Sequence, residues 1–331
     1  MANSSRQKDY AALYAQFASA LHGVDPSLQL GGPVFEDNSR DLKAWALKKH
    51  GETSWTKRFL AYLAAHGASN ELNFFSFEHY PFGTCSNKAD EDNLLREPGI
   101  ISHIISVWRS DGLPADIPMF VTETNYSSNE TDAAQEVTGA LWYAEMMGTV
   151  LSSGANGAFF YEYEPIPLSP SDPCRGWGTY GVLQGDHNYK AQAPLSQYFA
   201  AQMLTQNWSV PGNGDHTLYP ASISGNGSWI AAYPLTRPDS LWSLLLVNRD
   251  FENAHDVNIQ FNTIKGATWF TGPVTQTEFG PQQYGWIEAG RQSYPSPDGS
   301  AVTTIASGGE GVNYSLPAES ITVLTGTLDT R

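Results

Sequence analysis

Three carboxylates stand at the ends of short apolar segments, in a pattern that suits the cleavage of a glycosidic bond. They are Glu78, Glu123 and Glu162, and each follows a run of aromatic or aliphatic residues. A charged group in that position is costly unless it is paired or used in a reaction. In glycosidic-bond cleavage, one carboxylic acid protonates the departing oxygen while a second carboxylate attacks or stabilises the anomeric carbon. If one of them serves as the acid, Glu162 is our first choice, because its strand would bring it close to Glu123.

Strand alternation adds a geometric expectation for Glu123. The segment PMFVTETN (residues 118–125) is typical of a strand, and a period of two puts Met119, Val121, Glu123 and Asn125 on one face. The other interpretation is a structural carboxylate that is hydrogen-bonded at a strand end. For Glu78, Glu162 and Glu164 we favour a structural or substrate-positioning role over direct catalysis.

Aromatic and polar side chains flank these carboxylates in the sequence. Rings stack on the apolar faces of sugars, and their polar atoms can hydrogen-bond the hydroxyls. The alternative for each residue is packing: Trp177 and Tyr163 would fill loops, and His79 would be a satisfied core group. The residues that we expect to bind substrate are Glu78, His79, Tyr80, Asn125, Tyr161, Tyr163 and Trp177.

The elements that must position these residues alternate between helix and strand as far as residue 206. Short strands that are apolar on both faces and followed by helices predict a parallel sheet covered by helices. The polar residues gather at the carboxyl ends of the strands, where both (β/α)₈ barrels and doubly wound sheets bind ligands. Strands are expected at 28–33, 72–80, 118–125 and 157–163, and helices at 10–21, 45–66, 100–108, 133–151 and 194–204.

The chain divides into two regions of different character. Only four strand–helix units are visible in residues 1–210, whereas a barrel needs eight, so this region is either half of a (β/α) barrel or an open α/β layer. Residues 211–331 lose helical periodicity, and turn residues separate closely spaced β runs, which predicts an antiparallel β-sandwich. The runs lie at 229–233, 242–247, 257–261, 268–270, 303–305 and 321–325.

Composition narrows the class of ligand. The 331 residues carry 18 Lys+Arg against 34 Asp+Glu, a net charge of −16, and such a surface repels nucleic acid. No apolar run is long enough to span a membrane. The sequence has no nucleotide-binding glycine motif and no His or Cys spacing typical of metal ligation, so we expect neither a cofactor nor a metal. Low charge and many aromatic residues suit a carbohydrate ligand.

The start of the chain and the two cysteines bear on secretion and on disulfide formation. No basic stretch followed by an apolar core opens the chain, so no signal peptide is visible. Six Asn-x-Ser/Thr acceptors are a weak sign that the parent protein is secreted. Cys85 and Cys174 could form one bridge if their loops meet, although we favour two free thiols.

Four motifs in order resemble glycoside hydrolase clan A, and within it the β-xylosidase-like family 39. They are LGGP (30–33), FEHYP (77–81), FVTETN (120–125) and FYEY (160–163), which look like strands 5 to 8 of that barrel. The run SLWSLLLVNR (240–249) looks like part of the β-domain that often follows it. The resemblance implies that Glu123 is the nucleophile at the end of strand 7. It also implies that His79 and Tyr80 line the sugar site at the end of strand 6.

The resemblance departs from the clan's pattern at the acid/base glutamate, which follows an Asn at the end of strand 4. Asn70-Glu71 and Asn129-Glu130 match this Asn-Glu pattern. They lie before strand 6 and after strand 7 of the resemblance, so neither is placed at the end of strand 4. We therefore expect a retaining hydrolase-like protein for β-linked saccharides that lacks strands 1 to 4. The alternative is a non-catalytic or vestigial carbohydrate-binding fragment. An open half-barrel exposes apolar surface, so we expect self-association or pairing with the missing N-terminal half.

Overall fold

The computed structural model describes residues 4–35, 54–82, 90–170, 176–225 and 227–328. Cys85, Cys174 and residues 45–53 of one expected helix lie outside these ranges. The chain forms two compact units, and each unit is assembled from three separate segments of the sequence. The expected domain boundary near residue 210 stays a prediction. The first unit holds Met1–His79, Gly99–Thr124 and Ser153–Phe160, and the second holds Tyr80–Pro98, Asn125–Ser152 and Tyr161–Arg331.

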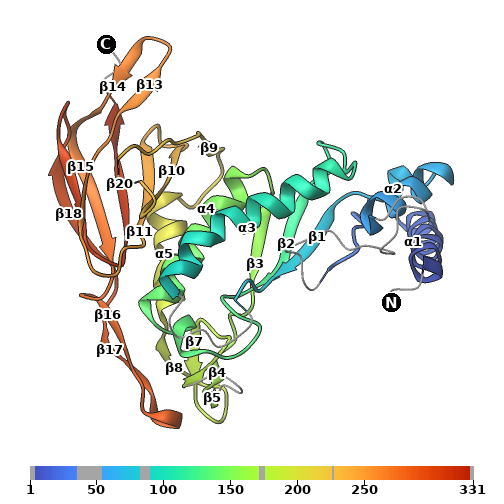
Figure 1. The fold of residues 1–331 in the computed structure, drawn as a ribbon, viewed down its shortest axis with the longest axis horizontal. Coiled ribbons are helices and arrows are strands. Elements are labelled where there is room, and N and C mark those ends of the chain that lie inside the picture. Colours follow the sequence, from blue (N-terminus) through green and yellow to red (C-terminus); the bar gives the residue numbers. More distant parts are fainter. Residues whose placement is uncertain (1–3, 36–53, 83–89, 171–175, 226, 329–331) are drawn as a thin grey trace. The chain divides into compact units, whose positions relative to one another are not determined.

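A parallel sheet of three strands, counted over the described residues, organises the first unit (Figure 1). The strands β1 (Phe75–His79), β2 (Met119–Thr124) and β3 (Gly157–Phe160) lie in the order β1-β2-β3, and both pairings are parallel. The expected parallel sheet is confirmed for these strands. The expected strand at 28–33 is reduced to one bridge between Gly31 and Phe74. Pro33 has no amide hydrogen with which to extend a ladder.

Helices α1 (Ser4–Val24) and α2 (Trp55–Ala65) also belong to the first unit. Ser54 caps α2 by accepting a hydrogen bond from the Lys57 amide, which satisfies one of the free N–H groups at the helix start. Aromatic rings join the two helices, because Tyr14 meets the fully buried Phe59 edge-on at 5.4 Å between centroids. A second stripe of α1 is exposed, and it comprises Leu13, Phe17, Leu21 and Val24.

Helix α3 (Asp90–Ser110) begins ten residues before the expected start at residue 100. Proline and glycine at 98 and 99 look like a boundary in the sequence, but the helix continues through Pro98. Glu97, just before this proline, is fully buried and accepts a hydrogen bond from the indole of Trp142 at 3.0 Å. This contact lies wholly in the second unit.

An antiparallel sheet and two helices build the core of the second unit. Over the described residues the sheet has six strands in the order β18-β15-β20-β11-β10-β9 (Figure 1). The expected antiparallel region is confirmed, although the long β15 was missed by the sequence. The strands are β9 (Thr217–Leu218), β10 (Ile230–Thr236), β11 (Trp242–Asn248), β15 (Phe270–Phe279), β18 (Val302–Ser307) and β20 (Ser320–Leu328).

Both faces of this sheet are covered. Helix α4 (Val137–Ser152) packs on one face of β10, β11 and β20, and the Tyr233 hydroxyl of β10 meets the Thr149 hydroxyl of α4 at 2.7 Å. Leu244 and Leu246 join a separate apolar cluster that includes Phe261 and Leu316. Burial on both sides explains why β11 reads as a continuous apolar run instead of alternating.

Shorter elements complete the second unit. Helix α5 (Ser196–Met203) packs beside α4 and continues into a π-helical turn (Leu204–Trp208). Strands β12 (His255–Asn258) and β19 (Asn313–Leu316) pair, as do β13 (Phe261–Thr263) with β14 (Gly266–Thr268) and β16 (Tyr284–Ile287) with β17 (Tyr294–Asp298). The stretch after β3, expected to be a loop, holds β4 (Ile166–Pro167), β5 (Ser169–Pro170), β6 (Trp177–Gly178), β7 (Leu183–Gly185) and β8 (Ala191–Pro194).

Candidate active site

Glu78 and Glu123 are register partners at the carboxyl ends of β1 and β2. The preceding partners are Phe77 and Val121. From that pair to the next, β1 advances by one residue and β2 advances by two. Thr122 is the extra residue, and its hydroxyl donates to the carbonyl of Phe77 at 3.3 Å. An extra residue of this kind is a β-bulge, which re-aims the side chains that follow it.

The bulge corrects the expected alternation along β2. Met119 and Val121 are buried, but Thr122 and Glu123 are both half-buried, so the period of two breaks at this point. Glu123 is therefore less buried than Met119 and Val121, the residues with which the alternation grouped it. It is aligned with the half-buried Glu78, so that two carboxylates end neighbouring strands of one sheet. Adjacent strands lie about 4.8 Å apart, which sets the scale of this pairing.

His79 closes β1 and is only 3% exposed. The Thr124 hydroxyl donates to the His79 carbonyl at 2.6 Å, which ties the ends of β1 and β2 together beyond their ladder. Tyr80 is half-buried and is the first residue of the second unit along the chain. Of these two expected sugar-binding residues, His79 has the smaller accessible surface.

Asn125 is a buried junction of the second unit. Its amide donates to the carbonyls of Tyr161 at 2.6 Å and Tyr180 at 3.1 Å. Its side-chain oxygen accepts from the amide of Tyr126 and from Gln197. An asparagine side chain offers two donors and two acceptor lone pairs, so these four bonds use its capacity. Asn125 thus positions the segments after β3.

Glu162 follows β3 by two residues, in the second unit. Its backbone N–H donates to the Tyr180 carbonyl, and its carbonyl accepts from the Val182 amide, both at 2.9 Å. These bonds fix the segment in a strand-like pairing, and the Glu162 side chain is half-buried. The Tyr161 ring is partly exposed and meets the ring of Tyr180 at 5.8 Å between centroids.

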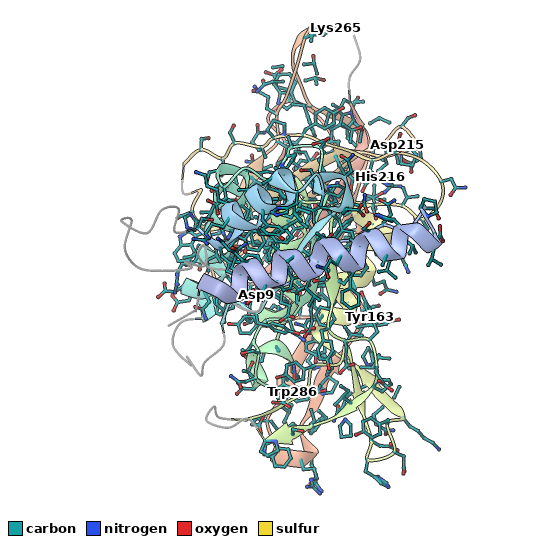
Figure 2. The ribbon with its side chains drawn as sticks, turned by 90° about the vertical axis from the view of Figure 1, so that its right-hand side faces the viewer. Asp9, Tyr163, Asp215, His216, Lys265 and Trp286 are labelled. Carbon is teal, nitrogen blue, oxygen red and sulfur yellow. The ribbon has the colours of Figure 1, made fainter. Side chains whose placement is uncertain are left out.

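Tyr163, which is labelled in Figure 2, combines an exposed side chain with an anchored hydroxyl. Its side chain is 60% exposed, yet its hydroxyl is hydrogen-bonded to the buried Tyr143. Burial first, and then the proximity of Tyr163, raises the pKa of the Tyr143 hydroxyl. A ring that is held at its polar end and open on its apolar body has the properties of a sugar-stacking platform.

Trp177 begins a short strand that leads to Tyr180, the residue paired with Glu162. Its indole is half-buried, and the guanidinium carbon of Arg291 lies 5.8 Å from the ring centroid.

Burial, followed by the charge of Glu130, raises the pKa of the Tyr180 hydroxyl to about 12. Tyr180 and Arg291 were missed by sequence reasoning. Both act through partners distant in the sequence, and no local pattern marks them.

Within the described ranges, no group of three or more His, Cys, Asp or Glu side chains is arranged to hold a metal ion. Among the helices that the structure describes, none has the length and apolar character needed to cross a membrane.

Comparison with known proteins identifies the fold. No family profile matches the chain, and no curated protein matches it by sequence. Solved structures do match. CelM2, a bifunctional glucanase-xylanase from a metagenome library, is 17% identical with a TM-score of 0.62, over 99% of this chain and 60% of that one.

Two further structures agree. A xyloglucanase of glycoside hydrolase family 44 from Paenibacillus polymyxa is 13% identical with a TM-score of 0.64, over 98% of this chain and 61% of that one. An α-L-arabinofuranosidase from Thermotoga maritima is 13% identical with a TM-score of 0.57, over 96% and 62%. This chain therefore spans less than two thirds of the length of each of these three proteins.

At these identities the likeness shows the fold alone, and it is a fold found in glycoside hydrolases. The coarse expectation from the sequence is thereby confirmed. Families 44 and 51 occur among the matched structures, and the finer likeness to family 39 stays a prediction.

Proposed function

We propose that this chain is part of a retaining glycoside hydrolase of clan A that acts on β-linked oligo- or polysaccharides, with Glu123 as its nucleophile. The observation that carries the proposal is the pairing of Glu123 with Glu78 at the carboxyl ends of parallel strands. That edge is where folds with parallel strands and covering helices place their chemistry. The glycoside-hydrolase fold supports the same conclusion.

The proposed reaction has two steps. The Glu123 carboxylate attacks the anomeric carbon as the glycosidic bond breaks, giving a covalent glycosyl-enzyme, while an acid protonates the departing oxygen. The same acid, now a base, then removes a proton from water, which releases the sugar with retained configuration. We assign the acid/base role to Glu162 and a hydroxyl-positioning role to Glu78.

Aromatic residues supply the proposed sugar contacts. Tyr161, Tyr163 and Trp177 are each at least partly accessible, and the Tyr163 ring is anchored through its hydroxyl. His79 ends β1 and Tyr80 follows it. The two residues complete the proposed binding set, with Asn125 as a positioning residue. A carbohydrate is the proposed partner.

Aryl β-glycosides with good and poor leaving groups test the roles. Glu123→Gln should lose several orders of magnitude in rate on both kinds of substrate, because no covalent intermediate can form. Glu162→Gln should lose activity mainly on poor leaving groups, which need protonation. Glu310→Gln, which removes an exposed carboxylate outside the proposed site, is the control. A Glu123→Gln rate equal to wild type would remove this residue from catalysis.

The exposed tyrosines also favour a second candidate, a carbohydrate-binding module without catalysis. Stacking on Tyr161 and Tyr163 needs no second carboxylate. A wild-type protein that binds oligosaccharides and hydrolyses none of the aryl glycosides would establish this candidate instead.

A further inference from the structure

The hairpin of β16 and β17 brings a cation to Trp177 within the second unit. These two strands are joined by the 3₁₀ turn Gly290–Gln292, and this turn packs beside β5. Strand β5 pairs with β6, which contains Trp177. Arg291 lies in this turn, with its guanidinium carbon 5.8 Å from the centroid of the Trp177 ring. The distance is within the range of a cation–π contact.

Hydrogen bonds hold the turn in one shape. The Ser293 hydroxyl donates to the Gly290 carbonyl at 2.7 Å and accepts from the Ala289 amide at 2.8 Å. The Gln184 side chain of β7 donates to the Ser293 carbonyl at 3.0 Å, which ties the turn to the neighbouring strands. Gly290 has a φ of 64°, and a Cβ there would lie 3.5 Å from the Trp177 indole nitrogen. The backbone of Arg291 is therefore fixed next to Trp177 before any ligand arrives.

Arg291 is exposed, and its guanidinium has no hydrogen bond or ion pair with any residue that the structure describes. Two other arginines of this unit are paired. Arg249 bonds Glu145 at 2.6 Å, and Arg237 bonds Asp239. Arg291 thus keeps its planar fork of donors available, which is the geometry that binds a carboxylate through two parallel bonds.

Glu288 is the carboxylate of the same turn. Its oxygens accept from the Gly290 amide at 3.0 Å and from the Trp177 amide at 3.4 Å, so it braces the turn against β6. Its charge opposes an incoming anion, as does the net charge of −16 on the chain. A preference for an acidic ligand therefore cannot come from the overall field and requires the local Arg291.

We propose that Trp177 and Arg291 form a subsite for a uronic acid residue of an acidic oligosaccharide. The indole stacks on the apolar face of the sugar ring, and the guanidinium binds its carboxylate. The subsite deepens the proposed carbohydrate function and rests on it only for the saccharide nature of the ligand. It names acidic heteropolysaccharide as the substrate class.

The test uses one ligand in two forms. A xylo-oligosaccharide with a single glucuronic acid branch is compared, by isothermal titration calorimetry, with the same molecule after reduction of its carboxyl group to an alcohol. The wild-type chain should bind the acidic form about tenfold or more tightly, as expected for one charge-assisted bidentate contact. Arg291→Gln should remove that preference, Arg291→Lys should keep part of it, and Trp177→Ala should weaken both forms.

Lys265→Gln provides a matched control, because it removes the same charge from the β13–β14 turn. Lys265 and Trp286 of β16 lie toward opposite ends of this unit in Figure 2. Equal affinity of the wild-type chain for the two forms, or a preference that survives Arg291→Gln, overturns the subsite. An Arg291-dependent preference without hydrolysis supports the subsite and contradicts the hydrolase. Glu123-dependent hydrolysis without a preference for the acidic form supports the hydrolase and contradicts the subsite.

Discussion

Glu78 and Glu123 are register partners even though β1 and β2 are one residue out of step before them. The extra residue, Thr122, removes Glu123 from the buried alternation of Met119 and Val121 and aligns it with Glu78. Strand periodicity alone would bury the carboxylate of Glu123. With Thr122 inserted, Glu123 is instead half-buried and aligned with Glu78. Bulges serve this purpose next to many active sites.

The pairing predicts a graded effect of removing each carboxylate. Glu78→Gln keeps the shape of the side chain and removes its charge. A charged hydrogen bond contributes about 1.5–3 kcal/mol, so kcat/KM should fall by roughly 10- to 100-fold. The loss should be much smaller than that of Glu123→Gln in the same steady-state assay. Glu310→Gln, at an exposed position, should leave kcat/KM within about twofold of wild type, and an equal loss in all three variants would contradict the assignment.

Part of this site was predictable and part was not. The carboxylates could be found because Glu78, Glu123 and Glu162 each follow an apolar strand, and strand ends show in local sequence. The bulge at Thr122 could not be found, because it depends on the register between β1 and β2 and not on either strand alone. For the same reason the junction role of Asn125, whose partners lie up to 72 residues away, left no local signal.

Asn125 should contribute to stability more than to chemistry. Asn125→Ala strands the Tyr161 and Tyr180 carbonyls and the Tyr126 amide without their partner. Unsatisfied buried groups cost about 1–3 kcal/mol each, although not additively, and we expect a loss of about 2–4 kcal/mol in the free energy of unfolding. Urea denaturation measures it. Asn188→Ala, at an exposed turn, should change stability by less than about 0.5 kcal/mol, and equal stability of both variants would refute the junction role.

Buried carboxylates predict how stability depends on pH. Glu145 is fully buried, and desolvation raises its pKa to about 8, with Glu97 adding to the rise and Arg249 opposing it. The native state thus holds a proton on Glu145 that the unfolded state releases above its ordinary pKa of 4.5. The stability from this group is complete below pH 4.5 and is lost as the pH rises through 8.

Unfolding by urea between pH 5 and pH 9 tests this sign. Glu145→Gln cannot titrate and keeps an oxygen for Arg249, so its stability should fall less steeply with pH than that of wild type. Glu310→Gln, an exposed control, should keep the wild-type slope. Identical slopes for wild type and Glu145→Gln would show that the burial of Glu145 does not control the pH response.

The fold shows a similar division between local and distant signals. Helix α1 was predicted because its apolar residues recur at helical spacing, whereas the start of α3 was missed because Pro98 and Gly99 resemble a helix boundary. Strand β15 was missed because Gly272 and Pro273 interrupt it, and the ladder shifts between Thr271 and Thr275. Pairing with β18 and β20 overrides that local interruption.

The exposed stripe of α1 predicts self-association between copies of this chain. Leu13 and Phe17 are 53% and 62% exposed, although both continue an apolar helical face. Light scattering after size exclusion should show an oligomer, and Leu13→Gln with Phe17→Gln should shift it toward the monomer. Ile264→Gln, in an exposed turn, should leave the mass unchanged. A monomeric wild type at tens of micromolar would count against the stripe as an interface.

Helix α4 approaches the six-stranded sheet closely enough to require glycine at position 148. A Cβ there would lie 2.5 Å from the Tyr233 ring, which is itself held by the Thr149 hydroxyl. Gly148→Ala should therefore destabilise the protein by about 1–3 kcal/mol, as overpacking does, despite the better helix propensity of alanine. Gly99→Ala in α3 meets nothing within 4 Å and should instead stabilise by about 0.5–1 kcal/mol. Calorimetric melting of the two variants separates these effects. A gain in both would mean that Tyr233 yields to the methyl group, and that the fit of α4 on β10 is not close.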